Sequence, residues 1–266
     1  MSDLDLIVLD VDGGPMLAEC VASIRAQTVA ARVVVFDNGS RTPVATADAE
    51  VHRSETNLGF TGGANAALRF SRAPYVGLVN NDVVLDPDWL EHVRDALDRD
   101  ARLAAVQTII RRPDGRIDGA GIDVSDGTFR QIGHGLPIGE PLAVPWGVSA
   151  TATLYRREAI GARFFDERFF AYYEDVELCA RLREEGWRTA VLPVVKATHR
   201  GSQSASILGG DALRLRTRNR YFVARLHRGA GRIRALLSED ARLLLRGRSS
   251  LRGIVEGLTR TMNEER

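Results

Sequence analysis

Carboxylate and amide side chains gather in three short polar clusters, and each cluster directly follows an apolar run of the sequence. The clusters are Asp10 with Asp12, then Asp37-Asn38-Gly39-Ser40, then Asn80-Asn81-Asp82. Ligands of open parallel sheets bind beyond the carboxyl ends of the strands, so the clusters predict one polar site at one edge of a sheet. Neighbouring carboxylates repel one another unless a cation, a ligand or hydrogen-bond donors compensate. A single Asp-Asn-Gly is more often a plain turn, so the prediction rests on the repetition.

A glycine-rich segment at residues 57–65 is the second chemical feature, and it contains Asn57, Gly59, Gly63 and Asn65. Its glycines let the backbone approach a ligand closely, and a helix beginning near residue 62 would offer free N–H groups to an anion. The segment is neither a dinucleotide fingerprint nor a P-loop, because G-x-G-x-x-G and G-x-x-x-x-G-K-[ST] are both absent.

A dense aromatic segment at residues 164–175 ends in Glu174 and Asp175, in a chain that is only 6% aromatic. The aromatic residues can be core packing, and acidic residues at a helix start can be plain terminal charges. A carboxylate against aromatic walls also acquires a raised pKa, which is what a general base at neutral pH needs.

Apolar runs alternate with helical patterns through the first half of the chain. We expect strands at 4–9, 32–36, near 51, 75–79, 103–110, 144–154 and 189–195, and helices from 13, at 62–71, 87–97, 156–160 and 175–185. Residues 111–140 are rich in Gly, Asp and Pro, and we expect loops or a small hairpin there. This alternation predicts an α/β fold with a mostly parallel central sheet flanked by helices.

The 266-residue composition, 44% hydrophobic and 27% charged, excludes disordered and fibrous classes. No apolar run approaches the roughly 20 residues of a membrane-spanning helix, and the first residues lack the basic start of a secretion signal. Two cysteines cannot build a disulfide framework, so we expect a cytoplasmic location.

Charge is unevenly divided, because residues 200–266 hold 15 Arg against 6 acidic residues while the rest of the chain is net acidic. Helical spacing in this region predicts amphipathic pieces whose apolar stripes are Ile233, Leu236, Leu237 and Leu244, then Leu251, Ile254, Val255 and Leu258. Such a region can contact an anionic membrane at its inner face, pack on the body, form a homodimer, or be a solvated pair of helices. We expect no nucleic-acid partner.

The ordered set of motifs over residues 4–222 resembles glycosyltransferase family 2, inverting transferases with the GT-A nucleotide-sugar-binding fold. It is most similar to the rhamnosyltransferase-like branch, whose N-x-G-F-x-G-G-x-N pattern fits residues 57–65. That branch also carries F-x-x-Y-x-E-D-x-E-L-x-x-R, which fits residues 169–181, and an R-N-R segment like residues 218–220. The resemblance implies a GT-A domain at 1–204, followed by a basic amphipathic helical region at 205–266.

The resemblance implies a role for each matching position. Asp175 is the expected catalytic base, with Glu174 its neighbour, and Asp82 and His199 are the expected ligands of Mg²⁺ or Mn²⁺ on the donor diphosphate. Trp146 and Tyr173 are expected on the acceptor side. The remaining matched positions are expected to bind the donor: Asp10, Asp12, Asp37, Asn57, Gly59, Gly63, Asn65, Asn80 and Asn81.

These expectations describe an enzyme that moves a sugar from a nucleotide-diphosphate donor, dTDP-rhamnose or a UDP-hexose, to a hydroxyl of a glycan or lipid-linked saccharide. One alternative is a sugar-nucleotidyltransferase, which would carry a basic glycine-rich segment where Asp10 and Asp12 stand. The other is a non-catalytic nucleotide-sugar-binding protein of the same fold, which would be free to lose Asp82 or Asp175.

Overall fold

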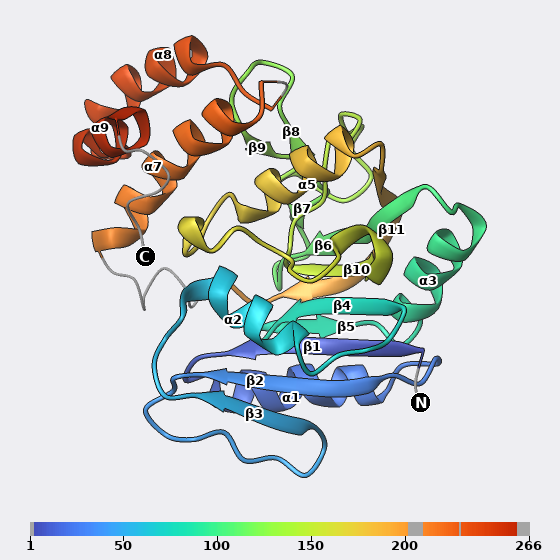
Figure 1. The fold of residues 1–266 in the computed structure, drawn as a ribbon. Helices are drawn as coiled ribbons and strands as arrows, with labels where there is room; N and C mark the ends of the chain where they lie inside the picture. The colour runs from blue at the N-terminus through green and yellow to red at the C-terminus, as the bar shows by residue number, and fades with distance from the viewer. Residues whose placement is uncertain (1–2, 202–209, 229, 260–266) are drawn as a thin grey trace.

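A central nine-stranded sheet organises the molecule (Figure 1). The computed structural model describes residues 3–201, 210–228 and 230–259. The strands of this sheet are β1 (Leu4–Asp10), β2 (Arg32–Asn38), β3 (Glu50–Ser54), β4 (Tyr75–Asn80), β5 (Val83–Leu85), β6 (Leu103–Arg111), β7 (Ile117–Gly119), β10 (Ala152–Arg156) and β11 (Arg188–His199). Their order is β3-β2-β1-β4-β10-β6-β11-β5, with β7 beside β6, and β8 (Ile122–Asp123) and β9 (Arg130–Gln131) form a separate pair.

Parallel pairing brings the ends of the first strands together. In the β1–β2 register Asp10 lies opposite Asp37, and in the β1–β4 register Leu9 lies opposite Asn80. The three polar clusters therefore share one edge of the sheet, as the sequence predicts. Most strands of the sheet run in one direction, as predicted, but the sheet is mixed. Strand β10 runs antiparallel to both β4 and β6, β5 runs antiparallel to β11, and β7 runs antiparallel to β6.

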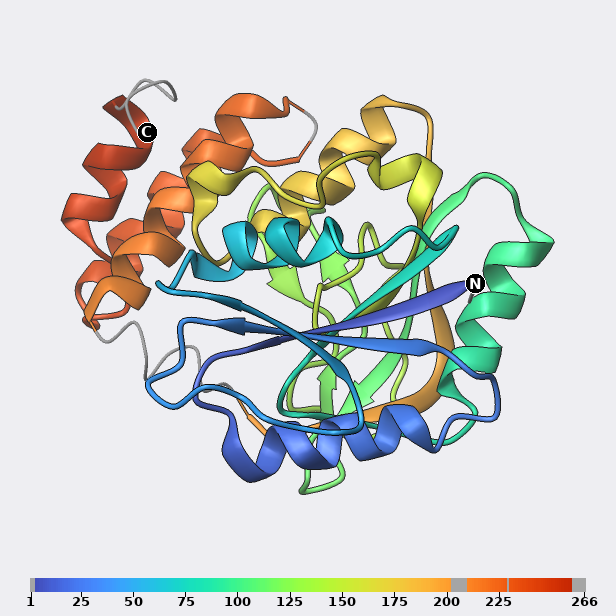
Figure 2. The ribbon, with the colours of Figure 1, turned by 60° about the horizontal axis from the view of Figure 1, so that its bottom comes forward.

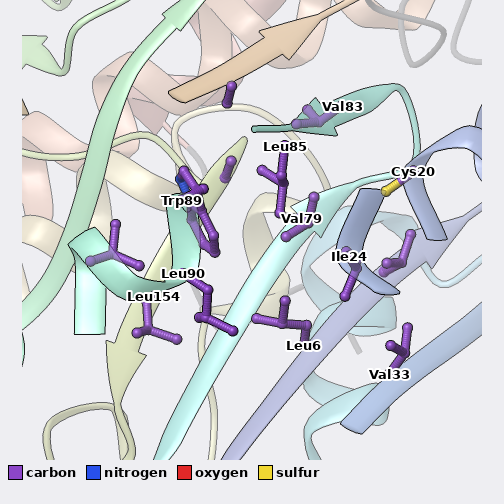
Figure 3. Close-up of a cluster of buried hydrophobic side chains, with 14 of the residues drawn as sticks. Leu6, Cys20, Ile24, Val33, Val79, Val83, Leu85, Trp89, Leu90 and Leu154 are labelled. Carbon is purple, nitrogen blue, oxygen red and sulfur yellow. The ribbon is translucent and has the colours of Figure 1, made fainter. Parts of the chain in front are cut away.

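Helices cover both faces of the sheet. Successive side chains of a strand point to opposite faces, so a fully apolar strand gives both faces of the sheet side chains that must be buried. Leu6 and Val8 of β1 pack under α1 (Gly14–Arg25) and α3 (Trp89–Arg99), in the cluster drawn in Figure 3. Ile7 and Leu9 belong to the other cluster, under α2 (Gly59–Leu68) and α5 (Glu174–Glu184). Figure 2 shows α1 and α2 on opposite sides of the sheet.

Several predicted boundaries are wrong, among them the end of the last strand, which is expected at residue 195 and lies at His199 in β11. The glycine-rich segment is the first part of α2, which begins at Gly59 and ends at Leu68, so the expected start near residue 62 is too late. The expected strand at 144–154 is a strand only from Ala152, in β10, and α4 (Arg157–Ile160) follows it directly. Residues 111–140 hold the short strands β7, β8 and β9 between loops, as expected.

Three helices form a layer at the C-terminal end: α7 (Gly210–Leu226), α8 (Ile233–Leu244) and α9 (Leu251–Thr259). Phe222 and Val223 of α7 pack against Phe169 and Val176 of the body. Gly253 and Gly257 let α9 approach the backbone of α7, where a Cβ would lie 2.7 Å from the carbonyl oxygens of Arg214 and Arg218. Within the described residues, no helix is long and apolar enough to cross a bilayer.

A buried carboxylate, Asp240, ties this layer together. It accepts hydrogen bonds from Arg220, from the Tyr221 hydroxyl at 2.6 Å and from the Ser249 hydroxyl at 2.7 Å. We therefore expect Asp240→Ala to lower the free energy of unfolding by about 3–5 kcal/mol, because it leaves a buried guanidinium without this partner. Urea-induced unfolding measures the change.

Asp95→Ala is the matched control, because it removes an exposed carboxylate that pairs with Arg99 one helical turn away. We expect a cost of about 0.5 kcal/mol or less there. Similar losses in the two variants would contradict a structural role for Asp240.

Candidate active site

A cavity of about 740 Å³ opens at the carboxyl ends of β1 and β4. Among the residues expected in a site, those that line it are Asn57, Gly59, Asn80, Asn81, Asp82, Tyr173, Glu174, Asp175 and His199. Those that do not line it are Asp10, Asp12, Asp37, Gly63, Asn65 and Trp146. The cavity thus brings the third polar cluster, the start of α5 and the end of β11 to one hollow.

Asp10 and Asp12, the carboxylates after β1, bind neighbouring protein groups and do not line the cavity. Asp10 is buried and accepts a hydrogen bond from the Asn81 side chain at 2.7 Å, which fixes that amide at the rim. Burial raises the pKa of Asp10 despite this bond. Asp12 is exposed, and it accepts from the backbone amide and the guanidinium of Arg41, which lower its pKa.

Asp37 is fully buried, and both of its oxygens are engaged. They accept from the backbone amides of Ser40 at 2.9 Å and Val44 at 3.1 Å, and from the guanidinium of Arg53. Burial alone would raise the pKa of Asp37, but these bonds lower it. Asp37 therefore organises the loop after β2, while its neighbour Asn38 reaches the cavity wall.

The start of α2 is closed by side chains and by the aromatic segment. The Asn57 side chain accepts from the backbone amide of Gly59 at 2.8 Å, and the amide of Thr61 donates to the carbonyl of Phe170 at 3.1 Å. The expectation of free N–H groups is thus wrong for these two amides. Gly63 faces Leu9 and Asn38, where a Cβ would lie 2.6 Å from Leu9, so it is a packing position.

A chain of three charged side chains runs along one part of the cavity wall. The antiparallel pairing of β5 with β11 puts His199 beside Asp82, with Nε2 3.2 Å from a carboxylate oxygen. The Nδ1 of His199 lies 2.8 Å from a carboxylate oxygen of Asp118 on β7. Burial would lower the pKa of His199, but the two carboxylates raise it to about 9.

Asp82 and His199 fit the chemistry of a divalent cation. Neighbouring ligands of an octahedral ion with bonds of about 2.1 Å lie about 3 Å apart, close to the 3.2 Å found here. Asp118 would then hold the far nitrogen and orient the ring, a usual arrangement behind a histidine ligand. In the part of the chain that the structure describes, no three His, Cys, Asp or Glu side chains converge as a ready metal site. Among the described residues, these two side chains would therefore be the protein's ligands to such an ion.

Glu174 and Asp175 lie at the first turn of α5, facing the cavity. Burial raises the pKa of Asp175 to about 6, although backbone hydrogen bonds, among them the Val176 amide at 2.8 Å, lower it. Burial and the neighbouring Asp175 raise the pKa of Glu174 to about 8. One oxygen of Glu174 and the hydroxyl of Tyr172 are buried without a hydrogen-bond partner in the described residues, an arrangement that calls for a functional explanation.

The loop before α5 has an unusual backbone. Phe170, Tyr172 and Tyr173 all have positive φ, at 62°, 72° and 67°, a conformation that costs a non-glycine residue of order 1–3 kcal/mol. The side-chain amide of Asn219 on α7 donates to three carbonyls of this loop, those of Phe169, Ala171 and Tyr172, at 2.8–2.9 Å. Helix α7 therefore holds the segment that places the acid pair.

Two residues of the site carry no sequence signal of their own. Asp118 comes from the irregular region 111–140, and Arg216 of α7 lines the cavity with its guanidinium 4.6 Å from the centre of the Tyr172 ring. The nearby R-N-R segment at 218–220 is the one sequence feature of α7 that indicates a role near the site. Trp146, expected on the acceptor side, instead packs between two core clusters with Arg183 over its ring.

Comparison with known proteins gives one family. The sequence profile of glycosyl transferase family 2 matches residues 11–164, more than half of the chain. N-acetylglucosaminyl-diphospho-decaprenol L-rhamnosyltransferase of Mycobacterium tuberculosis is 28% identical over 293 aligned residues, 94% of each chain. The O-antigen biosynthesis protein RfbC of Myxococcus xanthus is 32% identical over 157 residues, which cover 53% of this chain and 12% of that protein.

Among solved structures, the fold is similar to that of Staphylococcus aureus TarS 1-349 in complex with UDP-GlcNAc. The TM-score is 0.59 at 17% identity, and the match covers 84% of this chain and 64% of that one. This likeness confirms the predicted GT-A fold class and carries no more than the fold.

The Asn219 contacts predict a local effect. We expect Asn219→Asp to speed amide hydrogen exchange at Phe169, Phe170 and Ala171 by about tenfold or more, because an acceptor replaces the donor that three carbonyls share. Exchange in β1 and β4 should stay at the wild-type rate and serves as the internal control. Unchanged exchange in the loop would show that Asn219 does not hold it.

Proposed function

The chain belongs to glycosyl transferase family 2 and is a glycosyltransferase, and from this premise we propose that it transfers a sugar with inversion, using Asp175 as general base. The observation that carries the proposal is the shared cavity, which is lined both by Asp82 with His199 and by Glu174 with Asp175. Transfer requires a group that binds the donor diphosphate and a base that accepts the proton of the acceptor hydroxyl, and both must lie in one cavity.

Asp175 would act on the acceptor. As the acceptor oxygen attacks the anomeric carbon, the bond from that carbon to the diphosphate breaks and the hydroxyl proton passes to the Asp175 carboxylate. Its pKa of about 6 suits this task, because the group is mostly ionised at neutral pH and still basic enough to take a proton. Glu174, with its higher pKa, would be mostly protonated and would donate a hydrogen bond to substrate.

The third polar cluster would hold the donor. Asn80 and Asn81 present amides at the rim, Asn81 being fixed by Asp10, and Asn38 and Asn57 add further amides to the wall. We propose that Asp82 and His199 hold Mg²⁺ or Mn²⁺. Such an ion supplies Lewis-acid stabilisation of the leaving diphosphate.

The donor and acceptor are proposed from similarity. One relative is a rhamnosyltransferase whose name gives N-acetylglucosaminyl-diphospho-decaprenol as acceptor. We propose dTDP-rhamnose as the first donor to test, with UDP-hexoses next, and a saccharide or lipid-linked saccharide as acceptor. Tyr172, Tyr173 and Arg216 would form the acceptor side, with Tyr173 as expected and Arg216 in place of Trp146.

The surroundings of the enzyme are also proposals. We propose a cytoplasmic enzyme that touches the inner membrane face peripherally through its C-terminal region, with a homodimer through the same helices as the competing arrangement. The division at residue 204 stays a proposal, and it falls outside the described residues. The nucleotidyltransferase alternative is disfavoured because Asp10 and Asp12, not basic residues, follow β1.

We expect Asp175→Asn to lower the rate of sugar transfer by about 100- to 10,000-fold while leaving donor affinity unchanged, since only the base is lost. Wild-type activity should fall as the pH drops below about 6, because protonation removes the basic form of Asp175. Initial rates across pH, with a panel of dTDP- and UDP-sugars and a saccharide acceptor, measure both effects.

The control is Asp48→Asn, an exposed carboxylate in the loop before β3 and outside the cavity. Transfer by Asp175→Asn at the wild-type rate would refute the assignment of the base. If the wild type neither hydrolyses nor transfers any sugar nucleotide of the panel, the proposed donor class is refuted.

Asp82→Ala is expected to abolish the dependence of donor binding on Mg²⁺ or Mn²⁺, because it removes the charged ligand of the proposed metal site. Calorimetric titration of dTDP or UDP, with and without the ion, measures this directly, and Asp48→Ala should behave as the wild type. An equal gain in affinity on adding metal to Asp82→Ala would place the ion elsewhere.

A further inference from the structure

The outer face of α8 and α9 leaves large apolar side chains in solvent. Leu245 is 90% exposed, Leu251 65% and Val255 51%, and Leu237 and Leu244 are also exposed. Only part of each predicted apolar stripe is buried, since Leu236 and Ile254 pack in the cluster with Tyr221 while these five residues point outward. Exposed apolar residues gathered in this way mark an interaction surface.

Arginines without partners surround these side chains. Arg234, Arg242, Arg246 and Arg248 are exposed, and no carboxylate of the described residues forms an ion pair with them. Other arginines of the same layer are compensated, as Arg220 is by Glu239 and Asp240 and Arg252 by Glu256. The positive charge of the C-terminal region is therefore uncompensated on the face that carries the exposed leucines.

Helical spacing groups the exposed side chains within each of the two helices. Leu237 and Leu244 are separated by seven residues, two helical turns, and so lie on one stripe of α8, with Arg234 one turn before them. Leu251 and Val255 form the corresponding stripe of α9, one turn apart. The connecting segment carries Leu245, Arg246 and Arg248. Figure 1 shows α8 and α9 on the outer side of the molecule, away from the central sheet.

We propose that this surface, residues 234–255 of α8, α9 and their connection, docks on an anionic phospholipid membrane. Leucines that enter the acyl boundary beside arginines that meet phosphates are the composition of an interfacial helix. A symmetric dimer through the same face would bring the arginines of two copies together, where like charges repel. An anionic lipid surface can bury the leucines and pair the arginines with phosphates at the same time.

This surface refines the membrane contact proposed above, and it does not depend on the identity of donor or acceptor. It is carried on α7, whose Arg216 lines the cavity and whose Asn219 holds the loop before α5. Removing the whole region would therefore damage the cavity as well as the surface. Point substitutions on the outer face separate the two roles.

The test uses the full chain and co-sedimentation with vesicles of phosphatidylcholine, with and without phosphatidylglycerol. We expect the wild type to sediment with the anionic vesicles, and Leu245→Glu with Leu251→Glu to weaken that binding at least about tenfold. Arg246→Gln with Arg248→Gln should weaken binding to anionic vesicles about tenfold or more and leave binding to neutral ones unchanged.

Val144→Glu is the matched control, because Val144 is 88% exposed and lies outside both the cavity and this surface. It should bind vesicles as the wild type does, and all variants should keep the wild-type melting temperature and transfer to a soluble acceptor. Transfer without vesicle binding would overturn the membrane surface and leave the transferase assignment standing.

Three outcomes would overturn the proposal: no binding of the wild type to anionic vesicles, equal loss in Val144→Glu, or a wild-type dimer that Leu245→Glu with Leu251→Glu converts to monomer. The last result, seen by light scattering, would assign the surface to a second copy of the chain.

Discussion

The strained loop at residues 169–173 is the constraint on which the site depends. Three of its non-glycine residues have positive φ, and an isolated chain would leave that conformation. Neighbouring helices hold it from two sides, because the Thr61 amide of α2 donates to Phe170 and the Asn219 amide of α7 donates to three further carbonyls. Gly59 is needed for this approach, since a Cβ there would lie 2.6 Å from Phe170.

The C-terminal layer is thereby part of the machinery that places the acid pair. Asn219 and Arg216 stand three residues apart on α7, so one contacts the loop while the other lines the cavity. The buried network around Asp240 fixes α7 against α8, and the two glycines of α9 fix it against α9. A region that reads in the sequence as a basic tail therefore has an inner face that serves the cavity and an outer face that is free for a partner.

How far the sequence predicts this site differs from residue to residue. Asp82 and Asn80 follow a buried apolar run, so the parallel sheet places them at its edge, and Glu174 with Asp175 begins a clear helical pattern. The same reasoning cannot see that Arg53 saturates Asp37, because that pairing depends on the β2–β3 register. Asp118 and Asn219 act through contacts 81 and 50 residues away in the chain, which no local pattern encodes.

The charge balance inside the cavity links these observations. The proposed donor diphosphate would bring negative charge to a wall that already holds Asp82, Asp118, Glu174 and Asp175. The raised pKa of Glu174 removes most of one charge at neutral pH, and without a metal ion the protonated His199 offsets Asp82 and Asp118 by lying between them. A divalent cation bound by a neutral His199 would take over that compensation. Asp175 is then the carboxylate of this group with no compensating cation within salt-bridge distance among the described residues. The arrangement thus isolates a single basic group at the point where an acceptor hydroxyl would lose its proton, while the other acids are neutral or paired.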